Sequence, residues 1–243
     1  MGRFLILLLL SLSFIPAKAQ YQHFQRGSIF YFNHESIRVF FFKSEEMELH
    51  VMDEGDVRSP RYGSLEQAMQ RSTCLAGINA SYFAADDEHS PIGLVVSEGK
   101  QIAPFSQGRF TVAGTLYDTG KQLRLERSTQ LTTPTKHMKA AIQAGPFLVE
   151  NQKPVAGLDD TRIAARSFVA TDGKGNWCIG MSSARSLKEL AETLSKHGSI
   201  GDFKVRTALN LDGGSSCTFW AWKHCYIPSY KQVRTYAGIR PRS

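Results

Sequence analysis

The sequence predicts an α+β fold in a single domain, built on a large mixed or antiparallel β-sheet with a few helices. Short runs rich in β-branched and aromatic residues, separated by Gly, Asp and Asn turns, recur along most of the 243 residues. Only two stretches, residues 64–72 and 187–198, combine helical spacing with capping signals. Strand runs with helices at separate places are typical of α+β proteins, and the length suits one domain.

The first nineteen residues have the pattern of a secretory signal peptide. Arg3 supplies the positive charge, residues 4–10 form an apolar core, and Ala17-Lys18-Ala19 has the small-x-small cleavage pattern. The apolar run is too short to span a bilayer. We therefore expect residues 1–19 to be removed and the chain to be secreted or periplasmic, with no membrane span after cleavage.

Residues 20–73 are expected to supply N-terminal strands and a helix to the same domain. Ser64 and Gln67 form a candidate capping box, in which each would hydrogen-bond to the other's backbone, at the start of a helix over residues 64–72. A turn is expected near residues 33–34. The predicted strands are residues 30–32, 37–42 and 48–52.

Residues 74–243 are expected to form the core of the domain. A nearly continuous apolar strand over residues 74–83 is interrupted by Asn79, and the acidic loop that follows, residues 84–90, lacks calcium-loop spacing. Turn residues indicate hairpins centred on residues 97–100, 118–121 and 172–175. Further strands are expected at residues 92–96, 110–117, 122–126, 140–150, 165–170, 177–181 and 236–240, with a loop at 225–234.

Three polar residues interrupt or end these apolar runs. Asp212 ends an apolar strand and is followed by Gly213, Gly214 and Ser215, which is either a simple turn or a site. Arg166 lies at the start of a strand, where a guanidinium either forms a salt bridge or binds a phosphate through two hydrogen bonds. Asn79 either bonds to a loop or orients a sugar.

Residue type also predicts a break in one strand and the cap of a second helix. Pro146 cannot donate a ladder hydrogen bond, so the chain must bend or open near Gly145, as a structural corner or as a site wall. Ser186 and Glu189 form a second capping box, opening a helix that Gly198 would stop.

The net charge and the cysteine content limit which partners, disulfides and metal sites the chain can have. Of the formal net charge of +7, Arg3 and Lys18 leave with the signal peptide, and no Lys/Arg block is dense enough to indicate a nucleic-acid surface. The remaining mild positive charge either forms a solvated basic face or favours anionic substrates or envelopes. Export permits disulfides, so Cys217 and Cys225 are a possible pair, and the cysteine spacing matches no zinc site.

Taken together, the ordered motifs resemble the phosphodiester glycosidase family. They are residues 76–83, 144–149, 166–180, 187–198 and 210–216, and they extend the resemblance over most of the mature chain. Two departures from the family pattern are Ala80, where Gly is common, and Ser-Phe-Val-Ala at residues 167–170, where Thr-Ala-Ile-Gly is usual.

The resemblance implies a hydrolase that cleaves a sugar-1-phosphodiester, similar to one of N-acetylglucosamine, into free sugar and phosphomonoester. Asp212 and Arg166 are its expected catalytic residues: Asp212 as base, nucleophile or stabiliser of the cationic sugar, and Arg166 as phosphate ligand. The expected substrate-binding residues are Asn79, Gly145, Gly213, Gly214 and Ser215. The amides of Gly213 and Gly214 and the Ser215 hydroxyl are expected to line an anion pocket.

The sequence lacks the signals that two other classes of hydrolase require. A serine hydrolase would need a Gly-x-Ser-x-Gly elbow, which is absent from the sequence, and a metal phosphodiesterase would need paired ligands, whereas the histidines are scattered. We expect no cofactor and no metal site, with a divalent metal left open. The main alternative is a non-catalytic module of the same fold that binds a cell-envelope glycan.

Overall fold

A seven-stranded sheet carries Asp212, Gly213 and Arg166, three of the seven predicted site residues. The computed structural model describes residues 30–34, 36–56, 58–131 and 135–242. Every strand pair within these ranges is antiparallel. In spatial order the seven strands are β1 (Phe30–His34), β2 (Ile37–Lys43), β13 (Asn176–Arg185), β12 (Ala164–Thr171), β15 (Thr207–Gly213), β10 (Phe147–Glu150) and β11 (Lys153–Pro154).

Two five-stranded sheets complete the β-structure. One contains, in order, β17 (Cys225–Ile227), β16 (Phe219–Ala221), β4 (Ala76–Asn79), β18 (Thr235–Pro241) and β3 (Met47–Asp53). The other contains β6 (Lys100–Ala103), β5 (Val95–Ser97), β9 (Ala140–Ala144), β7 (Gly114–Asp118) and β8 (Leu123–Arg127).

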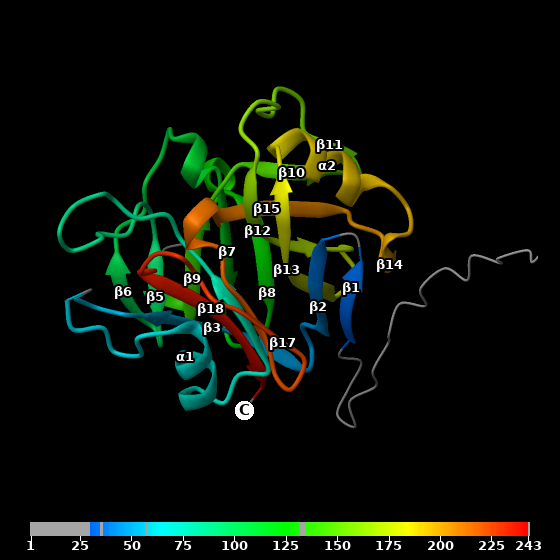
Figure 1. The fold of residues 1–243 in the computed structure, drawn as a ribbon. Coiled ribbons are helices and arrows are strands. Elements are labelled where there is room, and N and C mark those ends of the chain that lie inside the picture. The colour runs from blue at the N-terminus through cyan, green and yellow to red at the C-terminus, as the bar shows by residue number, and fades with distance from the viewer. Residues whose placement is uncertain (1–29, 35, 57, 132–134, 243) are drawn as a thin grey trace, which may run out of the picture.

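Two α-helices lie at separate places on this framework. Helix α2 lies against β10 and β11, whereas α1 lies on the opposite side of the molecule against the sheet of β4 and β18 (Figure 1). The helical elements are α1 (Leu65–Arg71), α2 (Leu187–Ser195) and the 3-10 turns η1 (Phe110–Val112), η2 (Ser128–Gln130), η3 (Thr135–His137) and η4 (Gly214–Ser216).

The main hydrophobic core lies where the three sheets meet. Ile179, Ile239 and Ile142, one from each sheet, belong to the same buried cluster. A second cluster joins the other face of the seven-stranded sheet to α2, where Leu190 packs with residues such as Ala208. Because this sheet is covered on both faces, its central strands can be apolar almost throughout.

The predicted single domain with a large antiparallel sheet and few helices is confirmed, and the structure adds two smaller sheets. The strand pattern over residues 140–150 opens near Gly145, as Pro146 predicted, and forms β9 and β10, which belong to different sheets. Pro146 has no N–H with which to continue a ladder, so the chain changes sheet there. The strands are therefore divided among three sheets.

Several predicted element boundaries need correction. The strand expected over residues 74–83 ends at Asn79, and β5 begins only at Val95. Residues 110–112 form η1 before β7 begins. The loop expected at 225–234 begins with β17, whose pairing with β16 depends on a tertiary contact that no local signal shows.

The two predicted helix caps behave differently. Ser186 and Glu189 form the complete capping box. Ser186 Oγ accepts from the Glu189 N–H at 3.0 Å, and Glu189 Oε2 accepts from the Ser186 N–H at 2.8 Å. Ser64 Oγ accepts from the Gln67 N–H at 3.2 Å, but Gln67 Oε1 accepts from Arg71 at 3.3 Å. The Gln67 side chain is thus directed along the helix. Helix α2 ends at Ser195, before the predicted stop.

The proposed disulfide is not present, because Cys217 and Cys225 are both free thiols. Cys225 lies opposite Ala221 in the β16–β17 pair. Cys217 is four residues before Ala221, which corresponds to about 13 Å of extended chain. A disulfide requires Cα atoms within about 7 Å, so this hairpin register separates the two sulfurs.

The predicted signal peptide, residues 1–19, lies outside the described residues. Within the described ranges, none of the helices combines the length and the apolar character needed to cross a bilayer.

Candidate active site

Asp212 lies at the end of β15, where the strand passes into η4. Its backbone N–H donates to the Ala80 carbonyl at 3.1 Å, and its Oδ1 accepts from the Gly213 N–H at 2.8 Å. Only 9% of the residue is exposed. Burial raises the pKa of the Asp212 carboxyl, and this effect outweighs the lowering by its hydrogen bonds. A raised pKa makes a carboxylate a stronger base near neutral pH.

Asn79, at the end of β4, holds the backbone of Asp212 in place. Its Nδ2 donates to the Asp212 carbonyl at 2.7 Å, and its Oδ1 accepts from Ser167 Oγ at 2.6 Å and from the Thr218 N–H at 3.1 Å. The residue is completely buried. The structure gives Asn79 a positioning role instead of the predicted sugar contact, because its oxygen and one amide hydrogen already bond to protein.

Arg166 reaches the same region from β12, where its backbone is paired with Gly213. Its Nε donates to the Arg185 carbonyl at 3.2 Å and its Nη2 to the Arg162 carbonyl at 2.6 Å. The Nη1 atom lies 3.9 Å from the position that a Cβ on Gly213 would occupy. Burial lowers the pKa of Arg166, but an arginine stays charged at any physiological pH. The guanidinium is therefore a fixed cation beside the Asp212 loop.

Tyr82 and Asn210 add a polar network that the sequence did not predict. Asn210 Nδ2 donates to the Tyr82 hydroxyl at 2.7 Å and to the Leu211 carbonyl at 2.6 Å. Burial raises the pKa of Tyr82, the charge of Asp212 raises it further, and that of Arg166 opposes the shift. Tyr82 therefore lies within electrostatic reach of both predicted catalytic residues. Asn210 Oδ1 is buried without a hydrogen-bond partner among the described residues.

Gly145 forms a packing corner beside this network. Its carbonyl accepts from the Tyr82 hydroxyl at 2.9 Å and from Asn210 Nδ2 at 3.0 Å. A Cβ at this position would lie 2.2 Å from the Phe110 carbonyl oxygen. Gly145 was predicted to bind substrate. The structure instead shows a residue whose lack of a side chain allows η1 to approach, and whose carbonyl is occupied.

Two exposed cations, Arg162 and Lys231, flank the Asp212 loop. The charges of both lower the pKa of the Asp212 carboxyl. Arg162 Nη2 lies 3.9 Å from the position of a Cβ on Gly214, and the backbone N–H of Lys231 donates to the Ser215 carbonyl at 3.2 Å. The loop is therefore surrounded by positive charge, which attracts an anionic group such as a phosphate.

The Gly213–Ser215 part of the loop differs in detail from the predicted anion pocket. The Gly213 N–H is used by the Asp212 carboxylate. Gly214 has φ +66°, a conformation that glycine adopts without strain, and begins η4. The hydroxyl that hydrogen-bonds to Asp212 belongs to Ser216, whereas Ser215 contributes its carbonyl to the neighbouring loop.

The structure thus gathers Asp212, Arg166 and Asn79 into one cluster, although they are far apart in sequence. Tyr82, Asn210, Arg162, Lys231 and Ser216 belong to the same cluster and were missed. Tyr82 and Asn210 could have been found, because each lies within a matched motif and carries a polar group in an otherwise apolar run. Arg162 and Lys231 lie on the surface, where single basic residues carry no distinguishing local signal.

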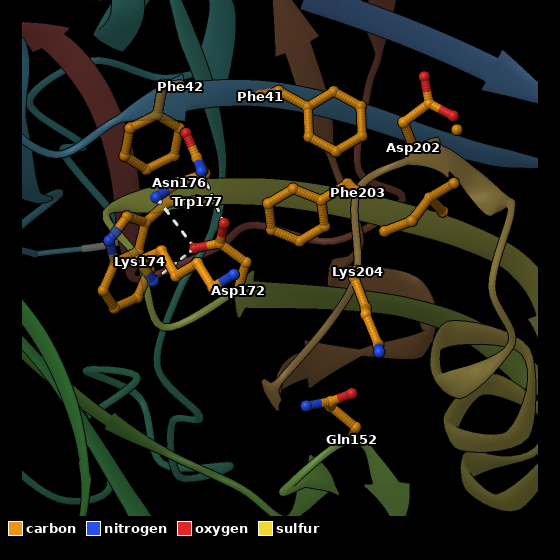
Figure 2. Close-up of a pocket in the computed structure, with 12 residues that line it drawn as sticks. Phe41, Phe42, Gln152, Asp172, Lys174, Asn176, Trp177, Asp202, Phe203 and Lys204 are labelled. Carbon is orange, nitrogen blue, oxygen red and sulfur yellow. Dashed lines mark hydrogen bonds between the residues drawn. The ribbon is translucent and has the colours of Figure 1, made fainter.

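A cavity of about 530 Å³ lies apart from this cluster (Figure 2). The Phe41 and Phe203 rings form one wall, with centroids 5.2 Å apart and a tilt of 46°. Asp172, beyond the end of β12, accepts from the Asn176 N–H at 3.1 Å and shapes the hairpin turn. Asp172 is six residues from Arg166, which corresponds to roughly 20 Å of extended chain. None of the twelve lining residues is a predicted site residue.

The described residues contain no group of three or more His, Cys, Asp or Glu side chains placed to hold a metal ion. The chemistry that the cluster can provide comes from one buried carboxylate, three cations and a tyrosine hydroxyl.

Comparisons with known proteins match this fold. The catalytic domain of zebrafish N-acetylglucosamine-1-phosphodiester alpha-N-acetylglucosaminidase, solved in a form auto-inhibited by its pro-peptide, is similar with a TM-score of 0.60 and 17% identity. The match covers 87% of this chain and 81% of that one. A hypothetical protein from Synechocystis has a TM-score of 0.54 and 15% identity over 91% of this chain and 61% of that one.

A putative exported protein from Burkholderia pseudomallei K96243 is also similar, with a TM-score of 0.57 and 12% identity over 88% and 75% of the two chains. The search of curated proteins gave no match. The fold that these structures share with this chain is an antiparallel, β-rich domain. The phosphodiester glycosidase family model matches residues 72–240, and the chain belongs to this family.

Proposed function

We propose that this protein hydrolyses the bond between the anomeric carbon of a sugar similar to N-acetylglucosamine and the phosphate of a phosphodiester. Water adds its oxygen to the anomeric carbon while the carbon–oxygen bond to phosphate breaks. The products are the free sugar and a phosphomonoester. The observation that supports this most is the burial of Asp212 near cations: the charges of Arg162 and Lys231 act on its carboxyl, and Arg166 lies beside Gly213. The reaction needs a basic carboxylate beside a bound anion.

Asp212 is the group proposed to activate the attacking water. Its raised pKa suits a general base, and Asn79 and the Gly213 N–H fix its position. The departing phosphodiester oxygen is a weak base, so a second carboxylate acting as a strong general acid is less necessary than in ordinary glycosidases. A single carboxylate is consistent with this chemistry.

The cations are proposed to bind the phosphate. Arg162 and Lys231 are exposed, and both act on the Asp212 carboxyl, so an anion placed beside the carboxyl lies within their field. Arg166 is anchored on two backbone carbonyls and provides a preorganised charge. Fixed positive charge of this kind stabilises negative charge that develops on the leaving group.

The experiment is an incubation of the mature chain with an N-acetylglucosamine-1-phosphate methyl diester, followed by product analysis. Free sugar with methyl phosphate is the expected result. Methanol with sugar phosphate would indicate cleavage at phosphorus, and tight binding without products would support the envelope glycan-binding module. Asp212→Asn is the matched control, and we expect it to reduce kcat by about 10²–10⁴-fold.

We further propose that the chain is exported and acts on the diester or on a related envelope glycan, without a cofactor. Fractionation of cells that express the full chain, compared with a chain lacking residues 1–19, tests the location. Turnover measured with and without EDTA tests the need for a divalent metal. Loss of activity in EDTA that is restored by metal would contradict the metal-independent mechanism.

A further inference from the structure

Three exposed apolar side chains belong to segments that contact the candidate active site. Phe110, Ile163 and Tyr230 are 56%, 54% and 95% exposed. They are three of the five large hydrophobic residues that are exposed in the described part of the chain. Single exposed apolar residues are ordinary, but these three come from separate loops and are all connected to one cluster.

Each of the three is joined to the cluster through its backbone or its neighbour. The Tyr230 N–H donates to the Ser215 carbonyl at 2.9 Å, in the loop that follows Asp212. Ile163 directly follows Arg162, whose carbonyl is bonded to Arg166. These two loops therefore approach the Asp212 loop and its cations, although they come from different parts of the sequence.

Phe110 is connected to the cluster through Gly145. Its carbonyl packs so closely against Gly145 that a Cβ there would lie 2.2 Å away. The Gly145 carbonyl in turn accepts a hydrogen bond from the Tyr82 hydroxyl, and the charge of Asp212 raises the pKa of that hydroxyl. Phe110, Ile163 and Tyr230 are called the apolar rim below.

We propose that the apolar rim binds an apolar alcohol group on the phosphodiester, so that the substrate is amphiphilic. This inference rests on the proposed function. The sugar would lie at Asp212 and the phosphate between Arg162 and Lys231, so the alcohol beyond the phosphate leaves the charged region and meets the rim. The positive charge complements the phosphate, and the exposed rings complement a hydrocarbon chain. A polar alcohol would leave these apolar surfaces in water.

The test compares two substrates that share the N-acetylglucosamine-1-phosphate part and differ only in carrying a methyl or an octyl alcohol. Each buried methylene contributes about fourfold in affinity, so contact with two or more predicts a kcat/KM about tenfold or more higher for the octyl diester. Both substrates are used below their micellar concentrations.

Three variants, Phe110→Ser, Ile163→Ser and Tyr230→Ser, and their combination test the rim itself. These side chains are exposed, so we expect the fold to persist. The octyl preference should fall toward onefold in the combined variant, while kcat/KM for the methyl diester stays within about twofold. The matched control is Tyr226→Ser, which should keep the preference. Tyr226 is 38% exposed and is paired with Trp220, in the cluster that α1 covers.

The outcomes separate this inference from the proposed function. Equal turnover of the two diesters by the unmodified protein, or an equal loss on both substrates in the rim variants, overturns the rim proposal and leaves the hydrolase. If neither diester is cleaved, the proposed function fails. In that case, calorimetric binding of both diesters to the Asp212→Asn variant still tests the rim proposal. Tighter binding of the octyl diester that the rim substitutions abolish supports the proposal. Equal binding of the two diesters overturns it.

Discussion

Asn79 provides a sharp test of how the site is organised, because the structure replaces its predicted role. Asn79→Ala removes bonds to the Asp212 carbonyl and the Thr218 N–H, which are both buried, and leaves the carbonyl only a long contact with Cys217 Sγ at 4.0 Å. Ser167 Oγ keeps a contact with Cys217 Sγ at 3.5 Å. An unsatisfied buried group costs about 1–3 kcal/mol, so two such groups should lower the free energy of unfolding by roughly 2–6 kcal/mol.

Urea unfolding followed by tryptophan fluorescence measures this loss. In a chain of this length it corresponds to a fall in Tm of roughly 5–20 °C. Ser167→Ala is the matched control: it removes one bond to Asn79 and should destabilise by only about 0.5–1.5 kcal/mol.

The kinetic signature separates a positioning role from direct contact with sugar. Displacement of Asp212 should reduce kcat for the methyl diester while KM changes little, because Asn79 does not touch the substrate. An Asn79→Ala protein with nearly unchanged stability, unchanged kcat and a raised KM would refute the positioning role. That result would restore the direct contact that the sequence suggested.

Three further predictions concern other parts of the molecule. Asp212→Asn should raise the free energy of unfolding at neutral pH. The buried carboxyl has a raised pKa, so its stabilising effect is complete below the unfolded pKa and is lost as pH rises through the folded pKa. Denaturation from pH 3 to pH 8 should show the variant's relative advantage growing with pH, and a constant difference would contradict this. Gly145→Ala should destabilise by about 1–3 kcal/mol or more, since its Cβ would meet the Phe110 carbonyl, and a wild-type Tm would exclude that close packing. Iodoacetamide should label Cys225 first in the native protein, because it is the only one of the four described cysteines that is not buried, and burial raises the pKa of Cys217 to about 11. Mass spectrometry that finds a Cys217–Cys225 disulfide would contradict the free thiols.

Local patterns were sufficient to predict many secondary-structure elements. Alternating apolar residues, the Asp172 turn and the Ser186 capping box predicted the hairpin of β12 and β13 and the start of α2, because these features depend on neighbours within a few residues. The division into three sheets was not predictable in this way. It depends on which distant strand pairs with which, and neighbouring residues carry little information about that choice.

The same distinction applies to the site. The positions of Asp212 and Arg166 stood out as polar residues in apolar surroundings, and the register that places Arg166 opposite Gly213 brings them together. The role of Asn79 could not be read locally, since an amide in a strand has the same appearance whether it bonds to protein or to a sugar. Its partners at Ser167 and Thr218 exist only in the folded chain.

The sequence by itself determined the approximate places of most strands and of both α-helices, which residues are chemically distinctive, and the family motifs in their order. These follow from the conformational and solvation preferences of each residue and its near neighbours. Only the tertiary structure decided that Gly145 is a packing corner, that Cys217 and Cys225 stay apart, and that Arg162 and Lys231 lie beside Asp212. Each of these depends on distances between segments that are remote along the chain, and strand register and side-chain packing fix those distances.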